Sequence, residues 1–511
     1  MGKPACWPCG APAAAVAMGA SSIQMPLEML MIDRKPSGAV KLVWIFCVCM
    51  TLLPPVAIAQ KSKQENAAHS TGSGGGSSHA VEIDMKDLPN QPLTMEQAVD
   101  YGLTHNRNLK SYQEEAMAVS QKVKQAQAGF LPKLDAKYSF TQIKDRPYVN
   151  LAIPGFPSEG VQTNITTANH WELDVTQPLF TGFNLTAQLN IARMGYKVAQ
   201  CSLESARLDL IRNIKHVFLQ VLLGEKLVEV ARDNVKALEM QRQNAEDYYH
   251  QGLTAKNDML KAEVALAEAV QTERAAVKQL TVIRSKLNQL LDLDIQSKIS
   301  LQDKKTTIEQ LPQLDALYRK AERQRPELIA LDTSILQADE GIRAAQSGYY
   351  PIVSAFGQYY REGQDFFGQD NPYTNEQNAS VGVKIAWNWF EGGKTEATAR
   401  ENKYRKRSLQ EQRRDLEKQI KIQVEDAYEQ LNVARANIQT TETALAQARE
   451  NERMTTLQYG EQLVIFLEVL NARVFTLQSS VNYYQALYGY QMALADLERA
   501  IGDRMIADNL K

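Results

Sequence analysis

The spacing of apolar residues along the chain predicts two long helical hairpins. Over residues 203–238 apolar side chains recur at heptad-like spacing, inside a stretch from about 185 to 249 that lacks proline; this pattern is typical of a long amphipathic helix. At 1.5 Å per residue, such a helix extends about 100 Å. The pattern breaks at residues 251–254 and resumes from 257 to about 291. Residues 394–458 and 466–500 repeat this arrangement.

Four shorter stretches alternate apolar and polar residues, which predicts strands with one apolar and one polar face. They cover residues 134–141, 171–176, 353–359 and 381–385. Trp171, Trp387 and Trp389 lie in or beside them, and aromatic residues suit membrane interfaces. An ordinary soluble sheet with one solvated face would show the same alternation. Four strands cannot close a barrel alone, so a membrane location requires oligomerisation.

The chain contains two copies of one unit. Residues 98–132 align without a gap on 317–351 at an offset of 219, and from residue 171 onward the offset is 210. The nine-residue change falls within residues 145–169, which are rich in Pro, Gly, Asn and Thr, as in an exposed loop.

The N-terminal region predicts export. Residues 42–59 form a strongly apolar run that follows basic residues and ends in Ala57-Ile58-Ala59, an A-x-A cleavage signal. An uncleaved membrane anchor is the alternative, since 18 residues are close to the shortest span. The residues before Cys47 and Cys49 are too bulky for a lipidation site. Residues 1–30 lack signal features, and Met31 is a candidate start.

These patterns divide the chain as follows. We expect a signal peptide over 1–59 with its core at 31–59, a flexible linker over 60–92, a first repeat over 93–292, a connector over 293–316, a second repeat over 317–502 and a tail over 503–511. Thr94 is expected to cap a single helix that runs to about Gly129.

Composition excludes several classes of protein. Fifty-seven Lys and Arg residues balance 59 Asp and Glu residues, so nothing favours nucleic-acid binding. Four of the five cysteines precede residue 50, which excludes a disulfide scaffold in the exported chain. The six histidines include no pair at ligand spacing. We therefore predict no enzyme, and no catalytic, cofactor-binding or metal site.

The sequence resembles the TolC-type outer-membrane efflux proteins over about residues 93–503. The supporting motifs are Leu93 to Ala98, the Gly-x-x-Pro before the first strand of each copy, Phe180-Thr181-Gly182 with its counterpart Phe390-Glu391-Gly392-Gly393, and the hairpin elements Tyr249…Gly252-Leu253…Asp258-Met259-Leu260 and Tyr459…Glu468-Val469-Leu470. Each motif is weak alone, but their order and duplication are specific.

The resemblance implies an internally duplicated α+β membrane protein that forms a homotrimer. Each protomer would give four strands to a twelve-stranded outer-membrane barrel, and its helices would form a coiled-coil tunnel in the periplasm. The implied function is the exit duct of a tripartite efflux or type I secretion system, a porin-like channel. The implied partners are a periplasmic adaptor (membrane fusion) protein, an inner-membrane transporter of the RND, ABC or MFS type, and outer-membrane lipid. The expected barrel residues are Leu134, Tyr138, Phe140, Trp171, Leu173, Val175, Val381, Val383, Ile385 and Trp387.

The resemblance also implies a gate at the periplasmic end of the tunnel. Glu468 occupies the first position of the family's acidic rings, and the second is Asn471 here. Asp258 and Tyr459 match positions that latch the closed state, whereas Val464 replaces the expected basic partner. A solvated Glu468 on an exposed helix is the alternative.

The two hairpin turns are the expected adaptor contacts. Their small or apolar residues would otherwise be charged on a solvated turn; the alternative is packing within the tunnel wall. Ile465 and Phe466 are expected to pack inward, which leaves Gly252, Leu253, Thr254, Ala255, Leu463 and Val464 as the contact residues.

Two other functions were weighed. An envelope adaptor also has a signal peptide and a helical hairpin, but it usually has one hairpin and β-rich lipoyl-like segments. A coiled-coil scaffold would need neither a signal peptide nor tryptophans on alternating strands.

Overall fold

A computed structural model describes residues 92–503, except residues 146, 151–153, 155–159 and 304–311. The predicted signal peptide, nearly all of the predicted linker, part of the connector and residues 504–511 of the tail lie outside the described residues. Among the helices described, none is both long and apolar enough to span a membrane.

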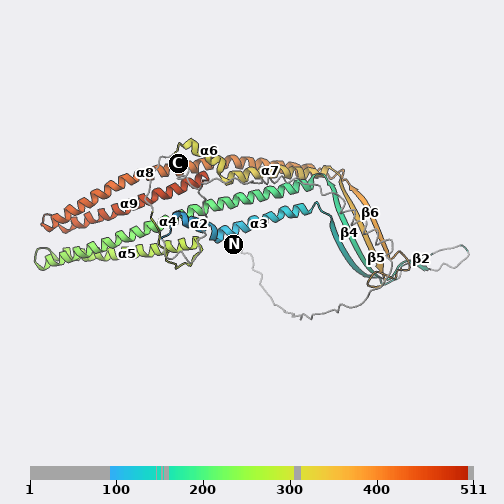
Figure 1. The fold of residues 1–511 in the computed structure, drawn as a ribbon, viewed down its shortest axis with the longest axis horizontal. Helices are drawn as coiled ribbons and strands as arrows, with labels where there is room; N and C mark the ends of the chain where they lie inside the picture. The colour runs from blue at the N-terminus through green and yellow to red at the C-terminus, as the bar shows by residue number, and fades with distance from the viewer. Residues whose placement is uncertain (1–91, 146, 151–153, 155–159, 304–311, 504–511) are drawn as a thin grey trace, which may run out of the picture. The chain divides into compact units, whose positions relative to one another are not determined.

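The first copy begins with two helices and ends with a helical hairpin, and strands lie between them (Figure 1). Its elements in chain order are α2 (Met95–His105), α3 (Arg107–Ala128), β1 (Lys133–Gln142), β2 (Tyr148–Asn150), β3 (Gly160–Gln162), β4 (Thr167–Thr181), α4 (Asn184–His250) and α5 (Lys256–Leu290).

The second copy has the same order, except that its loop carries no counterpart of the short β2–β3 hairpin among the described residues. Its elements are α6 (Leu314–Gln324), α7 (Pro326–Gln346), the 3₁₀ turn η1 (Ser347–Tyr349), β5 (Ile352–Gly363), β6 (Gln377–Ala386), α8 (Lys394–Gly460) and α9 (Phe466–Ile501). Elements up to the first strand of each copy start 219 residues apart, and later elements start 210 residues apart. The predicted domain boundaries remain predictions.

The expected single helix from Thr94 to Gly129 is wrong, although Thr94 does cap it. Thr94 Oγ1 accepts from the Gln97 N–H, and the Gln97 side chain accepts from the Thr94 N–H, which makes a capping box. The helix then breaks at Asn106, whose side chain accepts from the Leu109 N–H and donates to the Leu290 carbonyl at 2.9 Å. Asparagine thus ends one helix and caps the next.

Two consecutive residues with left-handed backbone conformations connect β4 to α4, and two more connect β6 to α8. Gly182 and Phe183 have φ of 60° and 69°, and Gly392 and Gly393 have φ of 60° and 82°. A Cβ on Gly182 would lie 2.6 Å from the Ser347 carbonyl oxygen, so only glycine fits there. The two glycine motifs therefore mark the same strand-to-helix junction.

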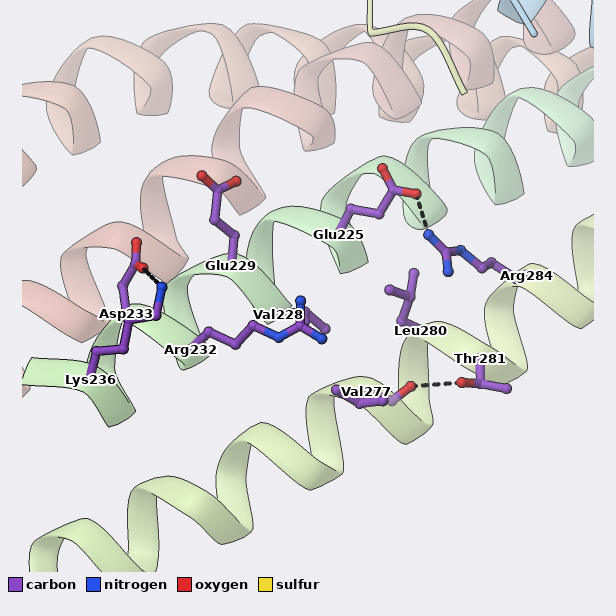
Figure 2. Close-up of a pocket in the computed structure, with 10 residues that line it drawn as sticks. All are labelled: Glu225, Val228, Glu229, Arg232, Asp233, Lys236, Val277, Leu280, Thr281 and Arg284. Atoms are coloured by element: carbon purple, nitrogen blue, oxygen red, sulfur yellow. Dashed lines mark hydrogen bonds and ion pairs between the residues drawn. The ribbon is translucent and has the colours of Figure 1, made fainter. Parts of the chain in front are cut away.

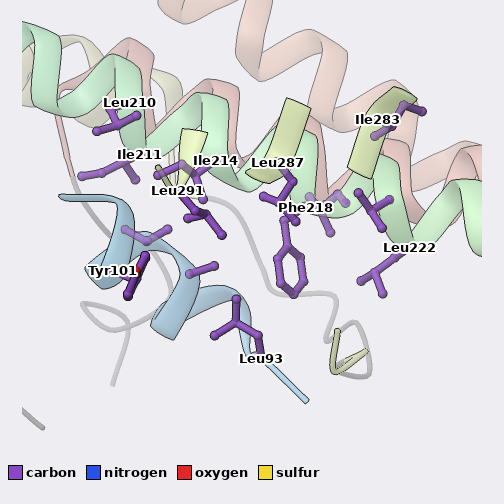
Figure 3. Close-up of a cluster of buried hydrophobic side chains, with 14 of the residues drawn as sticks. Leu93, Tyr101, Leu210, Ile211, Ile214, Phe218, Leu222, Ile283, Leu287 and Leu291 are labelled. Atoms are coloured by element: carbon purple, nitrogen blue, oxygen red, sulfur yellow. The ribbon is translucent and has the colours of Figure 1, made fainter. Parts of the chain in front are cut away.

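Two apolar cores hold the helices together at their middle. In the first, Tyr101 and neighbouring residues of α2 pack on Ile214 and Phe218 of α4 and on Leu287 of α5 (Figure 3). In the second, α6 and α7 pack on α8 and α9 around Leu431. Each hairpin is thus anchored by the short helices that open its own copy.

Buried ion pairs join the two copies beside these cores. Lys215 of α4 donates to Glu498 of α9 at 2.5 Å, and both side chains are almost fully buried. Arg499 of α9 binds Asp209 of α4 across the copies at 2.6 Å, and it binds Glu327 of α7, in its own copy, at the same distance. A buried charge that loses its partner destabilises a fold strongly, so the Lys215–Glu498 pair above all fixes α4 against α9.

Candidate functional site

The four long strands form one antiparallel sheet in the order β1-β4-β5-β6. Strand pairing places Leu134 opposite Val175, and Val175 opposite Gly357, which faces Val381. Residues paired across strands share a face, and faces alternate along each strand. Nine of the ten expected barrel residues therefore share one apolar face: Leu134, Tyr138, Phe140, Trp171, Leu173, Val175, Val381, Val383 and Ile385.

The opposite face of the sheet is polar and cross-linked by charge. Lys137 of β1 lies 2.7 Å from Asp174 and 3.5 Å from Glu172, both on β4. His170 Nδ1 of β4 lies 2.9 Å from Glu362 of β5. One face of the sheet thus suits hydrocarbon and the other suits water.

Trp387, the tenth expected barrel residue, lies outside the strand. β6 ends at Ala386 because its partner there is Ile352, the first residue of β5, so the ladder has no further partner. The Trp387 indole N–H instead donates to the Tyr349 carbonyl at 3.3 Å.

Aromatic side chains gather at both ends of the sheet. At one end Tyr138 contacts Trp171, and the Trp171 indole donates to the Phe366 carbonyl in the β5–β6 loop at 2.8 Å. At the other end Trp387 contacts Trp389, which is 82% exposed. Two such groups are the arrangement expected of side chains at two membrane interfaces.

The two hairpin turns lie at the ends of α4 and α8 remote from the strands (Figure 1). In the first turn Gly252 adopts φ of 71°, Leu253 is 49% exposed, and Ala255 is the N-cap of α5. Thr254 is half-buried. Apart from Thr254, the predicted contact residues of this turn are accessible.

In the second turn Gln462 takes the left-handed position that Gly252 has in the first, with φ of 60°. Leu463 is 73% exposed and Val464 is half-buried. Phe466 packs inward against Tyr459, as expected. Ile465 does not pack inward in the protomer: it precedes α9 in an extended conformation and is exposed.

Glu468 and Asn471 both lie on the exposed surface of α9. They are three residues apart, so they are neighbours on one face of the helix. In the protomer their side chains are free to face a lumen.

Asp258 and Tyr459 lie close together between the two hairpins, without a hydrogen bond between them. Asp258 is paired with Lys261 at 3.3 Å. The Tyr459 hydroxyl is buried and has no hydrogen-bond partner within the described residues. Burial raises the pKa of Tyr459, and the Asp258 carboxylate and Tyr248 raise it further. The predicted latch is thus incomplete at this place.

Arg473 of α9, which no sequence pattern singled out, makes a further polar connection between the hairpins, nearer their turns than the pairs of Lys215 and Arg499. Its guanidinium donates to Asn234 Oδ1 at 2.9 Å and to the Asp233 carbonyl at 3.0 Å, both on α4. It also donates to Glu452 of α8 at 2.7 Å. Arg473 and Arg499 are the only basic residues of α9, and that scarcity was the one available signal.

A groove of about 540 Å³ lies between α4 and α5 (Figure 2). Most of its charged side chains neutralise each other: Glu225 binds Arg284 at 2.7 Å, and Asp233 lies 3.9 Å from Lys236. The described residues contain no cluster of side chains suited to hold a metal ion.

Comparison with known proteins matches this chain to one family model and to individual proteins. Residues 100–292 and 317–503 match the family model described as outer membrane efflux protein. The outer membrane protein TolC of Vibrio cholerae serotype O1 is 22% identical over 320 residues, which cover 61% of this chain and 72% of that protein. The alkaline protease secretion protein AprF of Pseudomonas aeruginosa is 24% identical over 339 residues, which cover 64% and 68%.

A solved structure has the same fold. The CmeC outer membrane channel of Campylobacter jejuni superposes with a TM-score of 0.69 at 14% identity, and the match covers 86% of this chain and 94% of that chain.

Proposed function

The chain belongs to the outer membrane efflux protein family, and on that premise we propose that three copies close into one channel through the outer membrane. The protein is an outer-membrane exit duct for efflux or secretion, and its helices form a tunnel in the periplasm. The family is one of transport ducts, and we assign this chain no catalytic role.

The observation that carries the proposal is a two-faced sheet with open edges. In the described part of the chain β1 pairs only with β4, and β6 pairs only with β5. Unpaired edges are costly in lipid, where no water satisfies the backbone. Three copies supply twelve strands that close the edges, with the apolar face toward lipid and the polar face toward the lumen.

The sheet is the right height for a membrane. Arg361, opposite Trp171, lies nine residues from Ile352 at the other end of β5. Nine residues extend about 30 Å along a strand, or about 23 Å along the membrane normal at a tilt of about 40°. That height is close to the apolar band of about 25 Å in outer-membrane barrels, with the aromatic groups at its borders.

The hairpin turns are the proposed contact with a periplasmic adaptor, which connects the duct to an inner-membrane transporter. The contact residues are Gly252, Leu253, Thr254, Ala255, Leu463 and Val464. AprF is named an alkaline protease secretion protein, and CmeC is named an outer membrane channel. A secretion system and an efflux system both fit the proposed duct.

Glu468 is proposed to form a ring of three carboxylates at the tunnel constriction, with Asn471 as an uncharged ring beside it. A narrow acidic ring favours cations and hinders anions. A cation about 4 Å from one carboxylate gains about 1 kcal/mol in water and an anion loses as much, so Glu468→Gln should lower the cation-to-anion permeability ratio by about fivefold or more. It should also weaken block by multivalent cations. Planar-bilayer recordings of the purified protein measure both effects.

Glu411→Gln is the matched control for Glu468→Gln. Glu411 is an exposed carboxylate of α8 whose one ion pair within the described residues is with Arg414, at 2.8 Å. This variant should keep wild-type selectivity and block. Unchanged selectivity in Glu468→Gln channels would place the ring elsewhere, and wild-type protein that forms no channels would reject the proposed function itself.

A further inference from the structure

A pocket opens where the strands join the helices, between the start of α4 and the end of α7 (Figure 1). Its volume is about 320 Å³, at the small end of the range of about 300–1,000 Å³ for ligand pockets. Phe183 and Tyr350 line its end nearest the strands, and Arg343 and Glu340 line its other end. The hairpin turn lies at the opposite end of α4, so the pocket is separate from the proposed adaptor contact.

The aromatic end of the pocket continues the apolar face of the sheet. Phe180 of β4 pairs with Val353, which pairs with Ile385 of that face. The centroid of the Phe180 ring lies 5.4 Å from that of Phe183 and 6.4 Å from that of Tyr350. In the proposed duct the apolar face contacts hydrocarbon and the helices lie in the periplasm. This end of the pocket therefore lies at the periplasmic border of the membrane.

Charged side chains follow along α7 with increasing distance from that border. Arg343 precedes Tyr350 by seven residues, about 10 Å along a helix, and its side chain is 67% exposed. Glu340 lies about 4.5 Å further along the helix, and its side chain is 10% exposed. Lipid headgroups fill a layer of about 5–8 Å on each side of the hydrocarbon. The pocket thus crosses the headgroup layer, with apolar, cationic and anionic groups in that order.

Arg343 and Glu340 keep hydrogen-bonding capacity for a ligand. Arg343 Nη1 donates to Glu340 Oε1 at 2.7 Å, which is the one side-chain hydrogen bond of either residue within the described residues. A guanidinium has several N–H donors and a carboxylate accepts through both oxygens, so donors of Arg343 and Oε2 of Glu340 remain. The other residues that line the pocket are uncharged, so it contains one positive and one negative charge.

We propose that this pocket binds a phospholipid with an aminoethyl phosphate headgroup, phosphatidylethanolamine, from the periplasmic leaflet of the outer membrane. Its acyl chains lie on the apolar face beside Phe180, its phosphate binds Arg343, and its ammonium group donates to Glu340 Oε2. The lipid carries apolar, anionic and cationic groups in the order that complements the pocket. Both polar contacts are charge-assisted hydrogen bonds, which are roughly twice as strong as neutral ones. This inference rests on the proposed function, which places the sheet in the outer membrane.

The nearly buried carboxylate of Glu340 selects among phospholipids. A phosphoglycerol headgroup offers it no cation. A choline headgroup carries a bulkier trimethylammonium group that has no N–H to donate. Free phosphate could bind Arg343, but it gains nothing from the aromatic end of the pocket. Phosphatidylethanolamine is the ligand among these that fits both charges and the apolar end.

Native mass spectrometry of the protein extracted from outer membranes and delipidated measures the binding. Added phosphatidylethanolamine should bind with up to one molecule per chain, about tenfold or more tighter than phosphatidylglycerol or phosphatidylcholine with the same acyl chains. Inorganic phosphate in large excess should not displace it. Equal binding of the three lipids would overturn the headgroup assignment, and displacement by phosphate would overturn the lipid as the ligand.

Two variants separate the roles of the charges. Arg343→Met should weaken binding of phosphatidylethanolamine about tenfold, because it removes the contact to the phosphate at an exposed position. Glu340→Gln should instead abolish the preference for phosphatidylethanolamine over phosphatidylglycerol, because Arg343 remains. The comparison of lipids on the wild type tests the carboxylate even if Glu340→Gln does not fold.

Arg414→Met is the matched control for Arg343→Met. The Arg414 side chain is 71% exposed and pairs with Glu411, three residues before it, as Arg343 pairs with Glu340. It lies about 30 Å along α8 from the start of that helix at Lys394, well outside the headgroup layer. This variant should bind lipid as the wild type does. Unchanged binding by Arg343→Met, or an equal loss in Arg414→Met, would overturn the site.

Thermal unfolding gives a second readout of the same site. Phosphatidylethanolamine should raise the unfolding temperature of the wild type more than that of Arg343→Met, because a ligand of the folded state stabilises it. An outer-membrane trimer that binds no phosphatidylethanolamine would overturn this site and leave the exit duct intact. Protein that is absent from the outer membrane would reject the proposed function itself.

Discussion

Replacing Arg473 with Met should shift the resting channel strongly toward a more conducting state. Arg473 makes three hydrogen bonds that join α9 to α4 and α8. Near their turns the hairpins also meet in a small apolar cluster around Phe466 and in a ring contact between Tyr248 and Tyr459. A hydrogen bond to a charged group contributes about 2 kcal/mol net, so the loss of even one of the two bonds to α4 should shift the opening equilibrium of each protomer by about 30-fold.

We propose that Arg473 takes the role of the basic residue that Val464 replaces. The Tyr459 hydroxyl has no partner within the described residues, so the polar link between hairpins lies further from the turn than the family pattern implies. Single-channel recordings should show higher conductance or open probability for Arg473→Met. Cells that produce it should become sensitive to large antibiotics that the wild-type envelope excludes.

Arg453→Gln is the control for Arg473→Met. Arg453 is an exposed arginine of α8, and in the part of the chain that the structure describes its ion-pair partner is Glu450, three residues away. This change removes the same charge without touching α4 or α9, and its conductance should equal that of the wild type. Trimeric Arg473→Met channels with wild-type conductance would show that the hairpins are held by other contacts.

Leu253→Arg should abolish export while leaving the trimer assembled in the outer membrane. Leu253 is half exposed at the first turn, remote from the strands and from both apolar cores. A charge placed in a desolvated contact without a partner costs several kcal/mol, enough to lower adaptor affinity at least a hundredfold. Export of the cognate substrate, measured at equal protein level, reports the loss.

Ile295→Arg is the matched control for Leu253→Arg, since Ile295 is an exposed apolar residue of the segment after α5. This variant should export normally. Export at the wild-type rate by Leu253→Arg would remove the first turn from the docking surface.

The helices and strands could be predicted from local patterns, because side chains return to the same face about every 3.6 residues along a helix and every two residues along a strand. Alternation over residues 134–141 located β1 to within one residue at each end, and the absence of proline located α4 equally closely. Asn106 was missed because its capping bonds compete with a helix pattern that continues on both sides. Trp387 was predicted to be a strand residue, but β6 ends one residue earlier because its partner strand begins at Ile352. A local pattern in β6 does not show where β5 begins.

Contacts between the copies could not be predicted in this way. Arg473 and Asn234 are 239 residues apart, and no local pattern connects them. Ile465 and Phe466 were both expected to pack inward, but Ile465 precedes α9 in an extended conformation and is exposed, whereas Phe466 is buried. The duplication itself was visible in the sequence, because its two offsets identify the equivalent residues of the two copies.

The mass of the intact particle extracted from outer membranes tests the central claim most directly. Native mass spectrometry in mild detergent should find the protein in the outer-membrane fraction, as a particle with three times the mass of the mature chain. A particle of one chain, or a protein recovered only from the soluble periplasmic fraction, would contradict the closure of three sheets into one channel.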